Sequence, residues 1–253
     1  MSTCCTASAS TSRRVSNALL YALFAALGNV LGAVAVTRRA AMSLKLIEHF
    51  VAFGAGFMLA VGLVEVLPEA FVRSGQVAPA LVLAGYLAVH LTQHTVTPHF
   101  HFGEETHAVN ALAGTSALVG LLLHTFFDGV AIASAFLVRP ALGVMVFIAI
   151  FLHKLPEGVT ISSLMLAGGR SVGHATGAGA LLGLATVAGV LLTDHLGFLG
   201  RHGLALSGGV TLYVAASNLV PEFQGKRGWK MPAAFLAGAG VFYLTKVLLE
   251  GLI

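Results

Sequence analysis

Residues 111–166 read ALAGTSALVGLLLHTFFDGVAIASAFLVRPALGVMVFIAIFLHKLPEGVTISSLML, and this stretch decides the fold. It holds two apolar runs, 111–137 and 141–166, which meet at the Arg139-Pro140 pair. Each run exceeds the roughly 20 residues that a helix needs to cross the hydrocarbon core of a bilayer. Each also carries a histidine and a carboxylate near its middle. The stretch therefore predicts two membrane helices joined by a tight turn, with polar groups at mid-depth.

The same apolar character extends over the rest of the chain. Of its 253 residues, 57% are hydrophobic and only 9% are charged, against roughly 25% charged in an ordinary soluble domain. Further runs of membrane-spanning length cover 15–36, 46–71, 77–95, 171–193, 203–223 and 231–251. Only helices and closed barrels satisfy backbone groups in lipid, and these runs are too long for barrel strands. We expect an all-α polytopic bundle of eight transmembrane helices.

The polar segments define the domain organisation that we expect. Residues 1–14 form a polar N-terminal leader, and 15–253 form a single transmembrane domain. The longest polar connection, 94–110, carries His94, His99, His101 and His107. The two cysteines, Cys4 and Cys5, are adjacent in the leader, so neither a disulfide framework nor a zinc-finger spacing is available. Any metal site must use histidine, carboxylate and carbonyl ligands.

The net charge of +4 does not indicate nucleic-acid binding, because Lys and Arg lie mostly between the apolar runs. There they act as topology signals, with seven on one side against five on the other. This bias favours extracytoplasmic termini in the cell membrane. We expect the lipid bilayer as one partner, and Gly-rich helix faces permit a homodimer without requiring one.

One pattern recurs in four of the predicted helices: two metal-competent side chains stand four residues apart. The four copies are Glu65/Glu69, His124/Asp128, His153/Glu157 and Asn218/Glu222. The first and last copies lie near the ends of their helices, which run in opposite directions. This arrangement is typical of an inverted repeat, here of the first three and last three helices around the central pair 111–137 and 141–166.

The two central copies predict a metal site. Residues four apart share one face of a helix, so His124 with Asp128 and His153 with Glu157 can close around one cation. Two imidazoles and two carboxylates suit Zn²⁺ and also admit Cd²⁺, Fe²⁺, Co²⁺ or Mn²⁺. The alternative is that these groups only tie helices together by hydrogen bonds. Ionisable groups at mid-membrane cost roughly 2.5–3.5 kcal/mol each, which argues for a function.

Two glycines follow the carboxylates of the central pairs. We expect Gly129 and Gly158 to let the two central helices pack closely against each other. Pro156 cannot donate a hydrogen bond to the Leu152 carbonyl, which predicts a kink or an extra oxygen near the site.

At these residues the chain resembles the ZIP (Zrt-, Irt-like protein) metal transporters of the bacterial type, through HTFFDG at 124–129 and HKLPEG at 153–158. The resemblance covers essentially the whole chain. It implies import of zinc or a similar metal into the cytoplasm, with His124, Asp128, His153 and Glu157 as the transport-site ligands. Metal is then the substrate, and no cofactor is implied.

The chain departs from the family pattern after each histidine. Many bacterial members have Asn where this chain has Thr125, and Lys154 occupies a position that often holds a ligand for a second metal. A charged ammonium cannot ligate a metal. Our hypothesis is that Lys154 takes the place of a second cation by pairing with Asp128 or Glu157. The alternative is that Lys154 points away and pairs elsewhere.

The sequence thus predicts alternating access through the central site. The outer copies of the pattern are candidates for entrance and exit stations along the path: Glu65, Glu69, Asn218 and Glu222. Hydrated interface groups are the alternative for these four. The His-containing connection 94–110 either collects or senses metal or is a plain solvated loop.

Rival functions are weaker. An intramembrane metalloprotease needs HExxH, but Lys154 follows His153 and Glu157 stands where the second His would be. We therefore expect no enzyme. A receptor that binds metal without turnover and a proton or sodium transporter stay as alternatives, and paired histidines add little to sodium binding.

Overall fold

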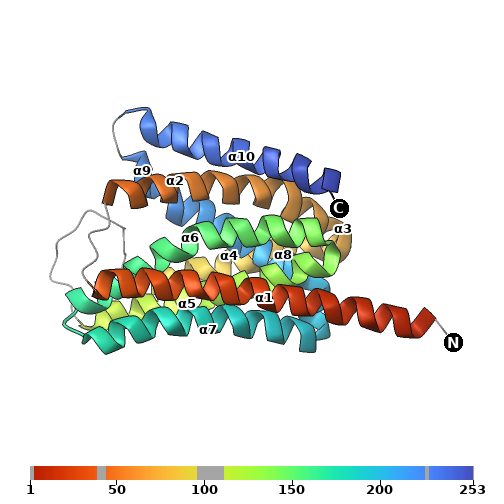
Figure 1. Cartoon of the computed structure of the whole chain (residues 1–253), viewed down its shortest axis with the longest axis horizontal. Coiled ribbons are helices and arrows are strands. Elements are labelled where there is room, and N and C mark those ends of the chain that lie inside the picture. Colours follow the sequence, from red (N-terminus) through yellow and green to blue (C-terminus); the bar gives the residue numbers. More distant parts are fainter. Residues whose placement is uncertain (1–2, 39–43, 96–110, 226–227, 253) are drawn as a thin grey trace.

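The computed structural model describes residues 3–38, 44–95, 111–225 and 228–252. Within these ranges the regular structure is helical and contains no strand, which confirms the all-α class. The helices lie roughly along one common direction, and the first helix and the last helix bring the two termini to the same end of the bundle (Figure 1).

The first half of the chain forms α1 and then a run of helical elements that reverses its direction once. The elements are α1 (Thr3–Thr37), α2 (Leu44–Val61), the π-helical turn η1 (Gly62–Val66), α3 (Leu67–Ser74), the 3-10 turn η2 (Gly75–Val77) and α4 (Ala78–Thr95). At Gly75 φ is +57°, a conformation that side chains with a Cβ disfavour, and here the chain turns back along the bundle (Figure 1). The helix α1 begins inside the leader predicted for 1–14, so the leader as a separate segment stays a prediction.

The second half contains the two helices with the candidate ligands. Its elements are α5 (Ala111–Val138), α6 (Pro140–Ala167), α7 (Val172–His195), α8 (Gly197–Tyr213), the π-helical turn η3 (Val214–Leu219), α9 (Pro221–Gln224) and α10 (Lys230–Leu252). Arg139 alone separates α5 from α6, and it is extended, with φ −156° and ψ 147°. Pro140 then starts α6, where a missing N–H costs nothing.

The two π-helical turns have the same cause. Pro68 follows η1 and Pro221 follows η3, and a proline can neither donate to the carbonyl four residues earlier nor pack closely against it. A wider turn just before the proline accommodates both effects. Glu65 lies in η1 and Asn218 in η3, so these two copies of the sequence pattern share a backbone form. The inverted repeat itself stays a prediction.

Six helical segments of the described chain are long and apolar enough to cross a membrane. They are Ser16–Thr37, Lys45–Thr95, Gly114–Val138, Pro140–Ala167, Val172–His195 and Lys230–Gly251. The 51-residue segment contains two of the predicted spans, 46–71 and 77–95, with the turn at Gly75 between them. The predicted span 203–223 is divided between α8, η3 and α9 and is absent from the six. The number of eight spans therefore stays a prediction.

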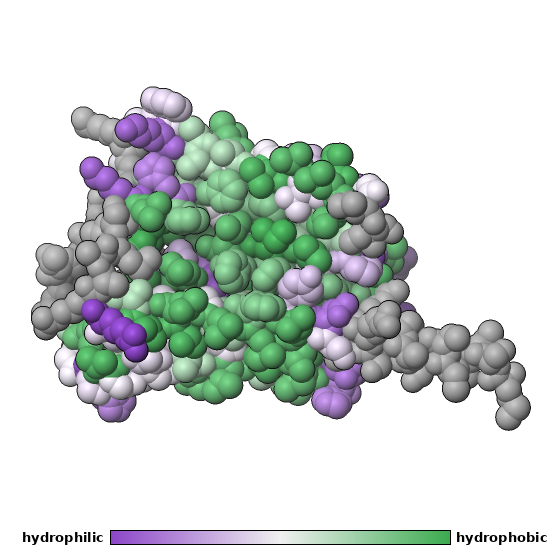
Figure 2. All heavy atoms as spheres, viewed as in Figure 1, coloured by the Kyte–Doolittle hydropathy of each residue, from purple (hydrophilic) through white to green (hydrophobic). Residues whose placement is uncertain are grey.

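The outer face of the bundle is apolar. Leucines and valines stay more than half exposed along several helices, among them Leu20, Leu184, Leu236 and Val247. Figure 2 shows apolar residues over the middle of one face and hydrophilic residues mostly toward the two ends. Soluble proteins rarely expose contiguous apolar surface of this extent. The chain is built as an integral membrane protein.

Candidate metal centre

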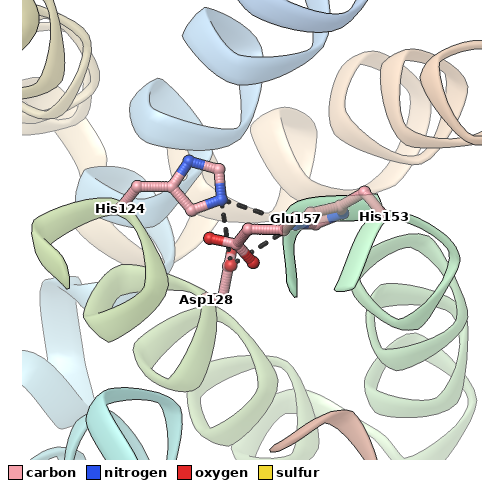
Figure 3. A group of neighbouring side chains, drawn as sticks. All are labelled: His124, Asp128, His153 and Glu157. Atoms are coloured by element: carbon pink, nitrogen blue, oxygen red, sulfur yellow. Dashed lines mark hydrogen bonds and ion pairs between the residues drawn. The ribbon is translucent and has the colours of Figure 1, made fainter. Parts of the chain in front are cut away.

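Four polar side chains from α5 and α6 meet inside the bundle. His124 and Asp128 come from α5, and His153 and Glu157 come from α6 (Figure 3). Each is at most 6% exposed, and one ligand atom from each lies within 4.8 Å of those from the others. The structure thus brings together the four side chains that the sequence singled out.

The distances within this group suit a small cation. His124 Nε2 lies 3.1 Å from Asp128 Oδ2, and His153 Nε2 lies 3.4 Å from the same oxygen. The two Nε2 atoms are 3.4 Å apart. Tetrahedral zinc with bonds of about 2.0–2.2 Å holds its ligand atoms about 3.3–3.6 Å apart. The three ligand atoms of His124, Asp128 and His153 therefore lie close to a tetrahedral spacing, and the Glu157 oxygen lies within 4.8 Å of them.

Hydrogen bonding determines which histidine nitrogen is available on α6. His153 Nδ1 lies 3.1 Å from the carbonyl oxygen of Ala149, which can only accept, so the ring nitrogen donates. In the neutral ring this leaves the Nε2 lone pair directed at the cluster. On α5, His124 Nδ1 and Asp128 Oδ1 are buried and have no hydrogen-bond partner within the described part of the chain.

Lys154 lies in the same cluster and is fully buried. Its ammonium is 2.6 Å from Asp128 Oδ2 and 2.8 Å from Glu157 Oε2, and it also reaches Thr125 Oγ1 at 3.5 Å. The side chain therefore pairs with both carboxylates, and the alternative that it points away is wrong. With ionised carboxylates, these three side chains carry a net charge of −1. That Lys154 replaces a second metal stays a hypothesis.

Two further side chains, which the sequence pattern did not identify as site residues, contact the cluster. Thr125 was noted only as a departure from a family pattern, yet its hydroxyl donates to Glu157 Oε1 at 2.7 Å. Asn29 of α1 is fully buried beside Glu157. In the sequence it is one of two asparagines, Asn17 and Asn29, in the apolar run 15–36, and no pattern distinguishes it from other polar residues.

The expectation for the two glycines was wrong. A Cβ on Gly129 would lie 1.9 Å from the Thr186 carbonyl oxygen of α7, and one on Gly158 would lie 2.1 Å from the Asn29 carbonyl oxygen of α1. These glycines therefore admit α7 and α1, whereas the ligand side chains occupy the space between α5 and α6. The helix α6 continues through Pro156 from Pro140 to Ala167.

The outer residues of the pattern lie apart from this group. Glu65 is 4% exposed, and its carboxylate pairs with Arg139 and, at 2.5 Å, with Lys246 Nζ of α10. Glu69 and Asn218 are half-buried, and Glu222 lies in α9. In the described ranges, His124, Asp128, His153 and Glu157 form the one cluster of three or more potential ligands. The role of the outer four as path stations stays a prediction.

The connection predicted to collect metal lies mostly outside the described residues, which stop at Thr95 and resume at Ala111. At its start, the rings of His90 and His94 contact each other with centroids 4.1 Å apart. Tyr213 packs edge-on against His90.

The comparison with known proteins, like the cluster of potential ligands, indicates a protein that handles metal ions. Residues 102–246 match the sequence model of the family described as ZIP Zinc transporter. Zinc transporter ZIP6 of Homo sapiens is 30% identical over 136 residues, which cover 49% of this chain and 18% of the human protein. Zinc transporter ZIP9-B of Xenopus laevis is 28% identical over 159 residues, 58% of this chain and 52% of the relative.

A third relative, metal cation symporter ZIP14 of Xenopus tropicalis, is 35% identical over 108 residues, which cover 40% of this chain and 22% of the relative. The chain thus spans from about a fifth to about half of the length of these three relatives. The family match includes both α5 and α6 and therefore all four side chains of the cluster.

Proposed function

The chain belongs to the ZIP zinc transporter family, and from this premise we propose that it carries a divalent transition-metal ion across the bilayer through the centre formed by His124, Asp128, His153 and Glu157. The observation that carries the proposal is the spacing of these ligand atoms inside a membrane protein, within 4.8 Å of one another and shielded from solvent. Zinc is the first substrate to test, followed by Cd²⁺, Fe²⁺, Mn²⁺ and Co²⁺.

The direction is uptake into the cytoplasm by alternating access, with both termini outside the cell membrane. Glu65 and Glu69 serve as entrance stations, and Asn218 and Glu222 as exit stations. The ion pairs of Glu65 with Arg139 and Lys246 support a path that opens only when these contacts rearrange. A homodimer is compatible with this scheme, and no enzymatic step is part of it.

The centre holds one metal ion at a time. Lys154 supports this stoichiometry, because its ammonium pairs with both carboxylates and offsets one of the two negative charges that a second dication would need. Two ions bound between α5 and α6 in a metal titration of the purified protein would contradict it.

The decisive experiment is zinc and cadmium flux into liposomes that contain the purified protein. We expect saturable flux in the wild type and its loss in His153→Ala and in Glu157→Ala. His174→Ala is the matched control, since His174 is exposed at the start of α7 and bonds to Ser171. Retained tight binding without flux in the wild type would overturn transport in favour of a metal-responsive receptor.

A further inference from the structure

The helix α1 passes very close to the metal centre at Asn29. A Cβ added to Gly158 of α6 would lie 2.1 Å from the backbone oxygen of Asn29, and one added to Gly32 would lie 2.3 Å from the Leu155 backbone oxygen. The two backbones are therefore in direct contact. This contact leaves the Asn29 side chain fully buried against α6, with no access to solvent.

The amide of Asn29 faces two hydrogen-bond acceptors. With its nitrogen toward α6, it donates to the backbone oxygen of Lys154 at 2.6 Å and to Glu157 Oε2 at 3.2 Å. The opposite orientation would set the amide oxygen against two other oxygens, none of which carries a proton to share. The chemistry of the neighbours thus fixes the orientation of the side chain.

Three helices consequently hold the Glu157 carboxylate. Thr125 of α5 donates to Oε1 at 2.7 Å, while Lys154 of α6 and Asn29 of α1 both donate to Oε2. Of these donors, Lys154 also pairs with Asp128 and carries a charge that an arriving dication repels. Asn29 is neutral and fixed by the contact of α1 with α6, so it keeps its bond when Lys154 moves.

We propose that Asn29 is a positioning residue that holds Glu157 in its ligand orientation, so that α1 forms the third wall of the metal centre. The proposal rests on the proposed function, in which Glu157 ligates the transported ion. Groups that orient a ligating side chain typically contribute 10–100-fold to metal affinity. We expect the loss of the Asn29 donor to weaken zinc binding by about this factor, with a smaller effect on the maximal flux.

The test measures zinc binding by calorimetry and zinc flux in liposomes for three variants. Asn29→Asp keeps the size but replaces the donor with an acceptor, and Asn29→Ala removes the group. Both should raise the half-saturation concentration about 10–100-fold. Asn29→Ser keeps a smaller donor and should lose less affinity than Asn29→Ala. If Asn29→Asp fails to fold, the alanine and serine pair decides.

A matched control separates positioning from packing. Ser162 of α6 is also fully buried and donates to the Ala175 backbone oxygen of α7 at 3.0 Å, so Ser162→Ala removes a comparable interhelical bond without touching Glu157. We expect this variant to bind zinc like the wild type. Asn29 variants with wild-type affinity, or with no larger loss than Ser162→Ala, would overturn the proposal.

The two proposals fail in different ways. If the wild type transports zinc and His153→Ala does not, but the Asn29 variants are unaffected, only the positioning role falls. If the wild type neither binds nor transports zinc, both the proposed function and the positioning role are refuted.

Discussion

Lys154 places a buried ammonium in the candidate metal centre, and under the proposed function its charge would oppose that of the transported ion. The ammonium contacts both carboxylates, and the three side chains sum to −1 when all are ionised. A bound dication would change that sum to +1 in a low-dielectric interior. We therefore expect Lys154 to stabilise the metal-free centre and to weaken metal binding, which suits the proposed function because a carrier must release its ion.

Replacing this lysine by an apolar side chain should reverse the balance. In Lys154→Met, Asp128 and Glu157 lose their counter-charge, and breaking such a buried pair costs about 3–5 kcal/mol. We expect a lower unfolding temperature in detergent without metal and recovery on addition of zinc. Zinc affinity should increase at least about tenfold, a gain of about 1.4 kcal/mol. Thermal unfolding with and without zinc, together with calorimetry, measures both effects.

A lysine outside the centre provides the control for that variant. Lys246 of α10 pairs with Glu65 and is partly exposed, so Lys246→Met removes an ion pair without changing the charge at the metal centre. Its zinc affinity should stay at the wild-type value. Equal zinc affinities in Lys154→Met and the wild type would show that the lysine does not compete with the metal.

At the level of the helices, glycines determine how the centre is enclosed. Gly158 admits α1 against α6, and Gly129 admits α7 against α5. The second contact is reciprocal, since a Cβ on Gly189 of α7 would lie 2.1 Å from the Phe126 backbone oxygen. Small residues at such crossings let backbones approach in lipid, where apolar burial alone does not drive helix association. The two helices with the candidate ligands, α5 and α6, are thus held in place by α7 and α1, which pack on their other faces.

A methyl group at one of these crossings should separate the helices. In Gly158→Ala, the new Cβ meets backbone atoms of Asn29 in α1. A helix backbone cannot move aside as a flexible side chain can. We expect destabilisation of about 1–3 kcal/mol, as for overpacked cores, and a loss of zinc flux because Glu157 is the adjacent residue. Thermal unfolding and liposome flux measure the two effects.

Gly177 of α7 offers a matched comparison, because a Cβ there would meet nothing within 4 Å. Gly177→Ala should be neutral or stabilising by up to about 1 kcal/mol through helix propensity. A Gly158→Ala protein as stable and active as Gly177→Ala would contradict the close contact between α1 and α6.

These helices also show what could be predicted from the sequence. A spacing of four residues fixes a shared face, so the pairs on α5 and α6 were identifiable without coordinates. The spacing does not show which helix packs against the opposite face of α5 or of α6, because that depends on how the other helices are arranged. Gly129 and Gly158 were assigned the wrong neighbours for this reason, and Asn29 was missed. The wide turns before Pro68 and Pro221 likewise depend on local backbone adjustment.

Across the whole molecule, other glycine contacts group the remaining helices. A Cβ on Gly56 of α2 would lie 1.9 Å from the Phe235 backbone oxygen of α10, and one on Gly209 of α8 would lie 1.9 Å from the Val82 oxygen of α4. Glu65 of η1, the turn that follows α2, pairs with Lys246 of α10 and with Arg139, the residue between α5 and α6. Through these ion pairs, the turn after α2 and the helix α10 are both connected to the start of α6, the helix that carries His153.

The path of the chain through the bilayer can be tested with single cysteines at Gln76, His195 and Gln224, all exposed, in a chain with Cys4 and Cys5 replaced by serine. The segments α3 and the end of α7 lie at the end of the bundle that holds both termini, and α9 lies at the opposite end (Figure 1).

Eight spans with outside termini predict that a membrane-impermeant maleimide labels Gln76→Cys and His195→Cys from outside intact cells. Gln224→Cys should react only after the cells are opened, because seven crossings from an outside N-terminus place it on the inner side. If Lys45–Thr95 crossed as a single span, Gln76→Cys would lie within the bilayer and stay unlabelled. In that arrangement, with the six candidate spans alone, His195→Cys and Gln224→Cys would also react from the same side. Labelling of these last two positions from one side would therefore refute the eight-span topology.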